Sequence, residues 1–176
     1  MKKIIMALVA CIIAVILVLV IHKFNINGIV QNEDVAVDEL KVIAISSFSN
    51  YAWSAQYRGM AIFNDGSIYS WDETDKETMG KYKLGTADGV QEFILNEGYK
   101  NLAKVSKNDL VKIKELINQV ENNIELNHVG ADMGTTTISV INENNEEIKL
   151  KASGDSMGEN KTEKAKDLLE ILDKYF

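Results

Sequence analysis

The sequence predicts an α+β fold class: an N-terminal transmembrane helix followed by a mostly antiparallel sheet built from hairpins, with two or three helices packed on one face. Three observations predict it. An uncharged apolar segment lies near the N-terminus, two pairs of β-rich runs are each separated by a short turn, and two later segments have the apolar spacing of amphipathic helices. Hairpins and helices in this order favour helices packed on an antiparallel sheet.

Residues 4–21 form an uncharged apolar segment directly after two lysines. At 1.5 Å per residue, a helix of this length is about 27 Å long, close to the roughly 30 Å thickness of the hydrocarbon core. The residues after Ile21 lack the small-x-small pattern of a signal-peptidase site. We therefore expect residues 1–23 to be an uncleaved signal-anchor that contacts the lipid bilayer through residues 4–21. Cleavage as a secretory signal peptide is the alternative.

The lysines around the segment predict its orientation. Lys2 and Lys3 outweigh Lys23, so we expect a single-pass protein of the cell membrane with a cytoplasmic N-terminus and an extracytoplasmic domain. Cys11, in Leu-Val-Ala-Cys, resembles a lipobox, but few residues precede it and more apolar residues follow. We expect it to be a small apolar residue of the spanning helix. Lipidation of Cys11 is the alternative.

Beyond residue 23 the chain is acidic. The formal net charge of the 176 residues is −7, and every Asp and Glu lies beyond the N-terminal segment. Such a surface argues against a nucleic-acid partner, whose phosphates require basic groups. Residues 24–38 are polar and Asn-rich, as in a tether, and residues 39–176 have the mixed composition of a folded extracytoplasmic domain.

The first part of the domain predicts strands. Residues 41–46 form a short apolar run with β-branched residues, which favours a buried strand. Residues 57–72 hold two β-rich runs around Asp65-Gly66, a pair typical of a two-residue hairpin turn. Counting outward from that turn predicts the residues that face each other and share one face of the sheet. The predicted pairs are Ile62 with Tyr69, Met60 with Trp71 and Arg58 with Glu73.

The middle of the chain gives weaker patterns. Residues 72–89 are charged and contain glycines, which predicts an extended loop or an edge strand around 79–84. Apolar residues with helical spacing follow, and residues 99–105 favour a short strand. The residues with helical spacing are Val90, Phe93 and Ile94.

The last third of the domain predicts two helices and a hairpin. Residues 106–109 resemble a capping box with Asp in place of Glu, and a helical apolar pattern follows. Its members are Leu110, Ile113, Leu116, Ile117 and Val120. Residues 135–141 and 147–152 flank two asparagines and predict a hairpin whose second strand has one solvent-exposed face. Residues 162–176 predict an amphipathic C-terminal helix.

Two local features resemble known proteins. The run from Ile62 to Tyr69 and the Gly154-Asp155 pair before a C-terminal amphipathic helix are similar to small exported or membrane-anchored proteins of Gram-positive bacteria. The resemblance covers about the last 130 residues of the chain. It brings no activity and no site residues with it.

Residues 154–158, Gly-Asp-Ser-Met-Gly, match the G-x-S-x-G pattern of a nucleophile elbow between a predicted strand and a predicted helix. Ser156 is therefore a candidate nucleophile, with His128 and Asp132 as partners, because a triad is defined by geometry and not by chain order. No His follows Ser156, as the α/β-hydrolase order requires, and a Gly/Ser/Asp turn also forms without a catalytic role. A serine hydrolase is thus the alternative function.

Tyr51 and Trp53 are candidate binding residues, because the hairpin pattern does not place them in the core. His128 is the one His outside the N-terminal segment, which excludes a multi-His metal site, and the acids at 72–77 lack EF-hand spacing. No cofactor motif occurs. We therefore expect no metal, no cofactor and a membrane-anchored, non-catalytic binding or interaction module with a protein or peptide partner.

Overall fold

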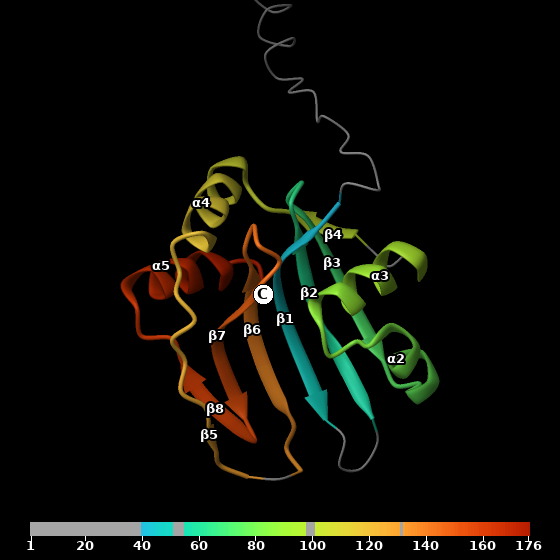
Figure 1. Ribbon diagram of the computed structural model, residues 1–176. Helices are drawn as coiled ribbons and strands as arrows, with labels where there is room; N and C mark the ends of the chain where they lie inside the picture. Colours follow the sequence, from blue (N-terminus) through green and yellow to red (C-terminus); the bar gives the residue numbers. More distant parts are fainter. Residues whose placement is uncertain (1–39, 51–54, 98–100, 131) are drawn as a thin grey trace, which may run out of the picture. The chain divides into compact units, whose positions relative to one another are not determined.

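Residues 40–50, 55–97, 101–130 and 132–176 are described by a computed structural model, and they belong to one unit that runs from Val37 to Phe176 (Figure 1). The predicted α+β class with an antiparallel sheet is confirmed for this unit. The expected anchor and tether lie outside the described residues. Among the described residues, no helix has the length and apolar character needed to span a membrane.

The described part of the chain forms eight strands and four helices. The strands are β1 (Val42–Asn50), β2 (Gln56–Phe63), β3 (Ser67–Glu73), β4 (Asn101–Lys104), β5 (Asn127–His128), β6 (Thr135–Ile141), β7 (Glu147–Gly154) and β8 (Ser156–Glu159). The helices are α2 (Lys76–Tyr82), α3 (Ala87–Glu97), α4 (Lys107–Ile117) and α5 (Glu163–Leu172).

One sheet with the strand order β4-β3-β2-β1-β6-β7-β8-β5 joins all the strands, and every neighbouring pair is antiparallel. The pairing of β1 with β6 connects the first four strands to the later ones. Strands β4 and β5 are the two edges of the sheet. The C-terminal end of β1 lies near the loop between β5 and β6, because the Asn50 amide donates to the carbonyl oxygen of Asp132 at 3.5 Å.

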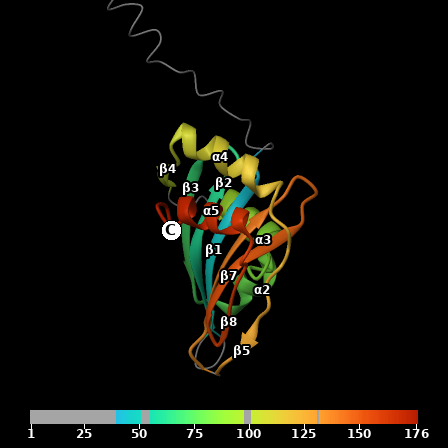
Figure 2. The same ribbon diagram turned by 90° about the vertical axis from the view of Figure 1, so that its left-hand side faces the viewer.

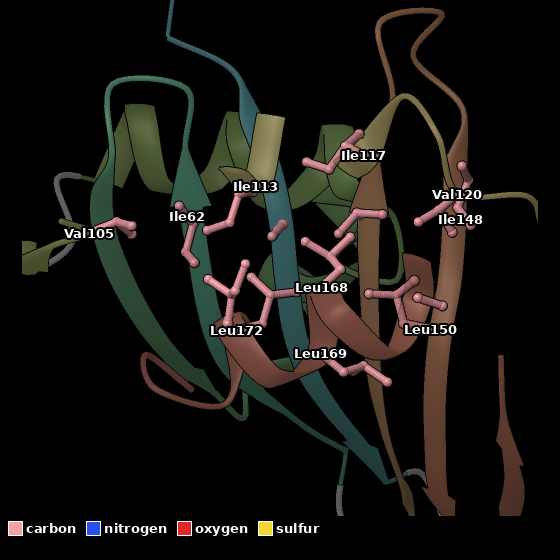
Figure 3. Close-up of a cluster of buried hydrophobic side chains, with 14 of the residues drawn as sticks. Ile62, Val105, Ile113, Ile117, Val120, Ile148, Leu150, Leu168, Leu169 and Leu172 are labelled. Atoms are coloured by element: carbon pink, nitrogen blue, oxygen red, sulfur yellow. The ribbon is translucent and has the colours of Figure 1, made fainter. Parts of the chain in front are cut away.

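The helices lie on both faces of the sheet, which corrects the prediction that they share one face. Figures 1 and 2 show α4 and α5 on one side and α2 and α3 on the other. Figure 3 shows the first core, in which Leu168 and Leu172 of α5 and Ile113 of α4 point toward the strands. The second core packs α2 and α3 on the opposite face. Two faces are covered because neighbouring strand residues such as Ile62 and Phe63 are both apolar, and both are fully buried.

The β2–β3 hairpin has a different register from the one predicted. The Gly66 N–H donates to the Phe63 carbonyl at 2.8 Å, and Gly66 has φ of 85°, so the loop holds three residues and ends in a bulge. The Asp65 carboxylate accepts from the backbone N–H of Ser67 at 2.9 Å and fixes this turn.

The extra loop residue moves each cross-strand pair by one position. The observed pairs include Ile62 with Ile68, Gly59 with Trp71 and Arg58 with Asp72, so the predicted pairs Ile62–Tyr69, Met60–Trp71 and Arg58–Glu73 are wrong. As a consequence, Ile62 and Trp71 lie in opposite cores of the sheet.

Helix α2 replaces the loop or edge strand that was predicted around residues 79–84. The Asp75 carboxylate caps it by accepting from the Thr78 N–H at 2.9 Å. Tyr82 is buried against the ring of Phe93, with 5.3 Å between the ring centroids, and its hydroxyl donates to Glu97. The prediction of a helix around Phe93 is confirmed by α3, and β4 confirms the short strand.

Helices α4 and α5 and the β6–β7 hairpin confirm their predictions, although α4 ends at Ile117, before Val120. The Ser106 hydroxyl accepts from the Asp109 N–H at 3.2 Å at the start of α4, and the Thr162 hydroxyl accepts from the Ala165 N–H at 3.3 Å at the start of α5. Strands β6 and β7 form the second hairpin. Its second strand alternates as expected between buried and exposed side chains, with Ile148, Leu150 and Ala152 buried.

The C-terminus is fastened to the first turn of α4. The Tyr175 hydroxyl donates to the Asp109 carboxylate at 2.7 Å and accepts from the Ser106 N–H at 3.1 Å. The ammonium group of Lys174 lies 3.6 Å from the same carboxylate. The Tyr175 hydrogen bond, together with Ser106 and Lys174, holds the pKa of Asp109 below its ordinary value of 3.8.

Replacing Tyr175 by Phe removes the hydrogen bond to Asp109, and we expect a lower Tm at neutral pH. A carboxyl whose pKa falls on folding stabilises the folded state above its unfolded pKa of 3.8, and this contribution is lost as the pH falls through the folded value. The difference in Tm between Tyr175→Phe and the parent should therefore shrink below pH 3.8, as thermal unfolding followed by circular dichroism measures. The control is Tyr69→Phe, since Tyr69 has ring contact with Phe63 but no hydroxyl partner among the described residues. The same pH dependence in both variants would contradict the assignment.

Candidate functional site

The β5–β8 edge, which we define as β5, β8, the loop 129–134 and the turn 154–155, ends the sheet on one side (Figure 1). Strand β5 has two residues and pairs only with β8 among the described strands, with Asn127 opposite Met157 and His128 opposite Ser156. The outer side of β5 therefore carries backbone groups that no described strand pairs. Such an edge can pair with a strand of another chain.

The turn between β7 and β8 positions the loop of this edge. Gly154 has φ of 113°, and a Cβ there would collide with the carbonyl oxygen of Gly134, so the position requires glycine. The Asp155 carboxylate accepts from the N–H groups of Met133 at 3.1 Å and Gly134 at 2.9 Å. The Asp155 carbonyl accepts from the Val129 N–H at 2.8 Å. Asp155 thus fastens the loop through both its side chain and its backbone.

The G-x-S-x-G motif has a different setting from the one predicted. It lies between β7 and β8, and not between a strand and a helix, because residues 156–159 continue as a strand before α5 begins. The Ser156 N–H is 3.3 Å from the Thr135 hydroxyl oxygen and donates to it. A nucleophile elbow needs a sharp strand-to-helix turn, and this connection is a hairpin.

The structure brings two of the three candidate catalytic residues together. Ser156 and His128 are directly opposite each other, and opposed side chains in an antiparallel pair share a face with Cβ atoms about 4.5–5.5 Å apart. Within the described residues, no hydrogen bond joins them and no carboxylate contacts the His128 ring. Asp132 lies on the adjacent loop with φ of 83°, where its carbonyl accepts from Asn50.

Exposed apolar side chains gather at this edge, and the sequence did not single them out. Of the six large hydrophobic residues that are exposed in the described part of the chain, three belong here, with exposed fractions of 50–63%. These three residues, which we name the edge patch, are Val129, Met133 and Met157, and exposed Leu126 directly precedes β5. The side chain of Leu126 lies over Gly158, and that of Met133 lies over Gly130. The candidate binding residues Tyr51 and Trp53 lie outside the described residues.

The surroundings of the edge patch are acidic. No Lys or Arg occurs between residues 115 and 148, whereas this stretch contains seven Asp and Glu residues. Glu125 and Asp132 are exposed beside the patch, and Glu159 is exposed on β8 opposite Lys151 of β7. Among the described residues, no group of three or more His, Cys, Asp or Glu side chains is placed to hold a metal ion. The chemistry of the edge is therefore that of an apolar surface with a negative border.

Replacing Asp155 by Ala should loosen the loop 129–134 without unfolding the sheet. The change removes the acceptor of two backbone N–H groups, and hydrogen bonds of this kind contribute about 0.5–1.5 kcal/mol each. Amide hydrogen exchange, measured residue by residue, should become faster at Met133 and Gly134 by about tenfold or more. Asp167→Ala, on the exposed side of α5, is the control. Unchanged exchange at both amides would show that Asp155 does not hold the loop.

Comparison with protein-family models, with curated proteins and with solved structures finds no match to this chain. The assignment of a function therefore depends on the side chains and backbone groups of the β5–β8 edge.

Proposed function

We propose that the chain is a membrane-anchored, extracytoplasmic, non-catalytic binding module that takes an extended protein segment at the β5–β8 edge. Residues 1–23 provide the anchor and residues 24–38 the tether in this proposal. The observation that carries it is the edge patch. In this patch Val129 is 59% exposed and Met157 is 50% exposed, beside a strand edge that no described strand pairs. Apolar side chains that are exposed together and bordered by polar residues are a feature of protein interaction surfaces.

The chemistry of the edge defines the partner. An extended segment can continue the sheet beyond β5 through backbone hydrogen bonds, while its alternate side chains contact the edge patch. Because β5 has only two residues, the backbone contribution is small, and the apolar contacts have to supply most of the affinity. The acidic border favours Lys or Arg next to the apolar residues of the partner.

Photocrosslinking in intact cells tests this proposal. With benzoylphenylalanine in place of Val129, we expect a discrete crosslinked product, and with benzoylphenylalanine in place of Leu102 we expect none. Leu102 is a matched control, because it is 47% exposed on β4 at the opposite edge of the sheet.

A second substitution shows whether the crosslink reports binding at the edge patch. Met157→Ser, introduced beside the probe at 129, should reduce the crosslinked product several-fold, because Met157 is 50% exposed and burial of that half contributes about half of the roughly 1.5–3 kcal/mol for a whole Met side chain. Leu102→Ser should leave the product unchanged. Equal crosslinking at 129 and 102, or a product that Met157→Ser does not reduce, would overturn the proposal.

The opposed pair of Ser156 and His128 favours one alternative, a serine hydrolase in which His128 accepts the proton of the Ser156 hydroxyl. A fluorophosphonate probe would then react with the Ser156 oxygen and release fluoride. We expect no labelling if the binding module is correct. Labelling of the full chain that Ser156→Ala and His128→Ala both abolish, and that Ser153→Ala retains, would instead establish the hydrolase. Ser153 is an exposed serine of β7 and serves as the matched control.

A further inference from the structure

A hollow lies at the end of the sheet away from the β5–β8 edge. It is a pocket of about 580 Å³ between the start of β1, the C-terminal end of α4 and the turn between β6 and β7. β1 runs from this pocket, which Val42 lines, to Asn50 beside the loop 129–134. The pocket and the edge patch are therefore separate sites. Its volume falls within the range of about 300–1,000 Å³ that is usual for small-molecule sites.

The floor of the pocket is apolar and its rim carries two lysines. Ile117 and Ile141 are buried, and Ile43 is half-buried. Lys41 and Lys114 are exposed at the rim. Among the described residues, neither ammonium group forms an ion pair, in contrast to Lys81, Lys104 and Lys174.

The polar groups of the rim are already oriented by the protein. Glu143, the one acidic residue among the described residues that line the pocket, accepts from the Asn118 amide at 2.7 Å. Asn142 accepts from the N–H groups of Asn144 at 3.0 Å and Glu146 at 2.9 Å, which fixes the β6–β7 turn. These rim groups are already ordered before a ligand binds, so binding costs little conformational entropy there.

We infer that this pocket binds a small organic anion, with a phosphate or carboxylate group between Lys41 and Lys114 and a short apolar group on the isoleucine floor. Beyond Lys23 the chain has 16 basic residues, which are the 19 of the whole chain less Lys2, Lys3 and Lys23, against 26 acidic ones. Two of these basic residues line one pocket with an apolar floor, in a chain whose acidic residues outnumber its basic ones. This site goes beyond the proposed binding of a protein segment and does not depend on it.

Phenyl phosphate is the probe, because it combines a phosphate with an apolar ring in a water-soluble molecule. The full chain, held in phosphatidylcholine nanodiscs and labelled with ¹³C at the isoleucine methyl groups, should show saturable shifts at Ile43, Ile117 and Ile141. Phenyltrimethylammonium, which has the same ring and the opposite charge, should produce none. Equal binding of both molecules, or no shifts with phenyl phosphate, would overturn the inference.

Lysine variants test the placement of the anion. Lys41→Ala and Lys114→Ala should each weaken phenyl phosphate binding by about fivefold, as expected for loss of one charged contact near the surface. Lys112→Ala is the matched control, because it removes the same charge from the same helix outside the pocket. An equal loss in Lys112→Ala would show that only the overall charge matters and would overturn the site.

The source of the anion can be a lipid headgroup or a free metabolite. The lipid composition of the nanodisc distinguishes these two sources. If phosphatidylglycerol in the bilayer raises the apparent Kd of phenyl phosphate, the headgroup competes for the pocket and lipid is the source. If the apparent Kd stays the same, the site takes a soluble anion. In both cases phenyl phosphate should shift the methyl signals of the pocket isoleucines, and Lys114→Ala should weaken this binding. Binding that Lys114→Ala does not weaken would contradict the site.

Discussion

Burial of β1 on both of its faces is the constraint on which the other elements depend. Ala44 lies in the core beneath α4 and α5, while Val42 and Ile45 lie in the core beneath α2 and α3. Each face would expose apolar surface to water without its helices, at a cost of roughly 25 cal/mol per Å². The pairing of β1 with β2 and β6 therefore divides the helices between two faces, and neither helix pair can leave without exposing the same central strand.

The apolar character of the central strands changes along their length, and this change positions both candidate sites. In β1, residues 42–45 are apolar, whereas residues 46–50 are mostly Ser and Asn. On the face that α4 and α5 cover, Ile62 of β2 is buried whereas Arg58 is exposed. On the opposite face, Tyr57 is still buried in the core of α2 and α3. Helices cover the sheet only where its side chains are apolar, because burial of apolar surface is favourable. The Lys41–Lys114 pocket forms beside the covered end, where α4 stops, and the β5–β8 edge forms at the other end, where turns replace helices.

Local patterns predicted those parts of the fold that nearby residues determine. The cap at Ser106 and the spacing of the α4 isoleucines involve neighbours within one or two turns, so the sequence was sufficient. The β2–β3 register depended on whether Gly66 ends a two- or a three-residue loop, which Asp65-Gly66 alone does not distinguish. Ser156 and His128 were candidates, but they face each other only because β5 pairs with β8. A strand of two residues is too short to show an apolar periodicity in the sequence. The edge patch was missed for the same reason, although the absence of Lys and Arg around it was a visible signal.

The groups of the β7–β8 turn favour binding over hydrolysis, because its polar atoms already hold the loop. The Asp155 carboxylate is engaged by the Met133 and Gly134 N–H groups, so it is not available to orient His128. The Ser156 N–H donates to Thr135 and is not directed at an oxyanion near its own hydroxyl. A triad needs an orienting acid and preorganised donors in addition to a serine and a histidine that face each other. What the turn leaves facing solvent is the thioether of Met157 and its apolar neighbours, which are suited to contact a partner and not to transfer a proton.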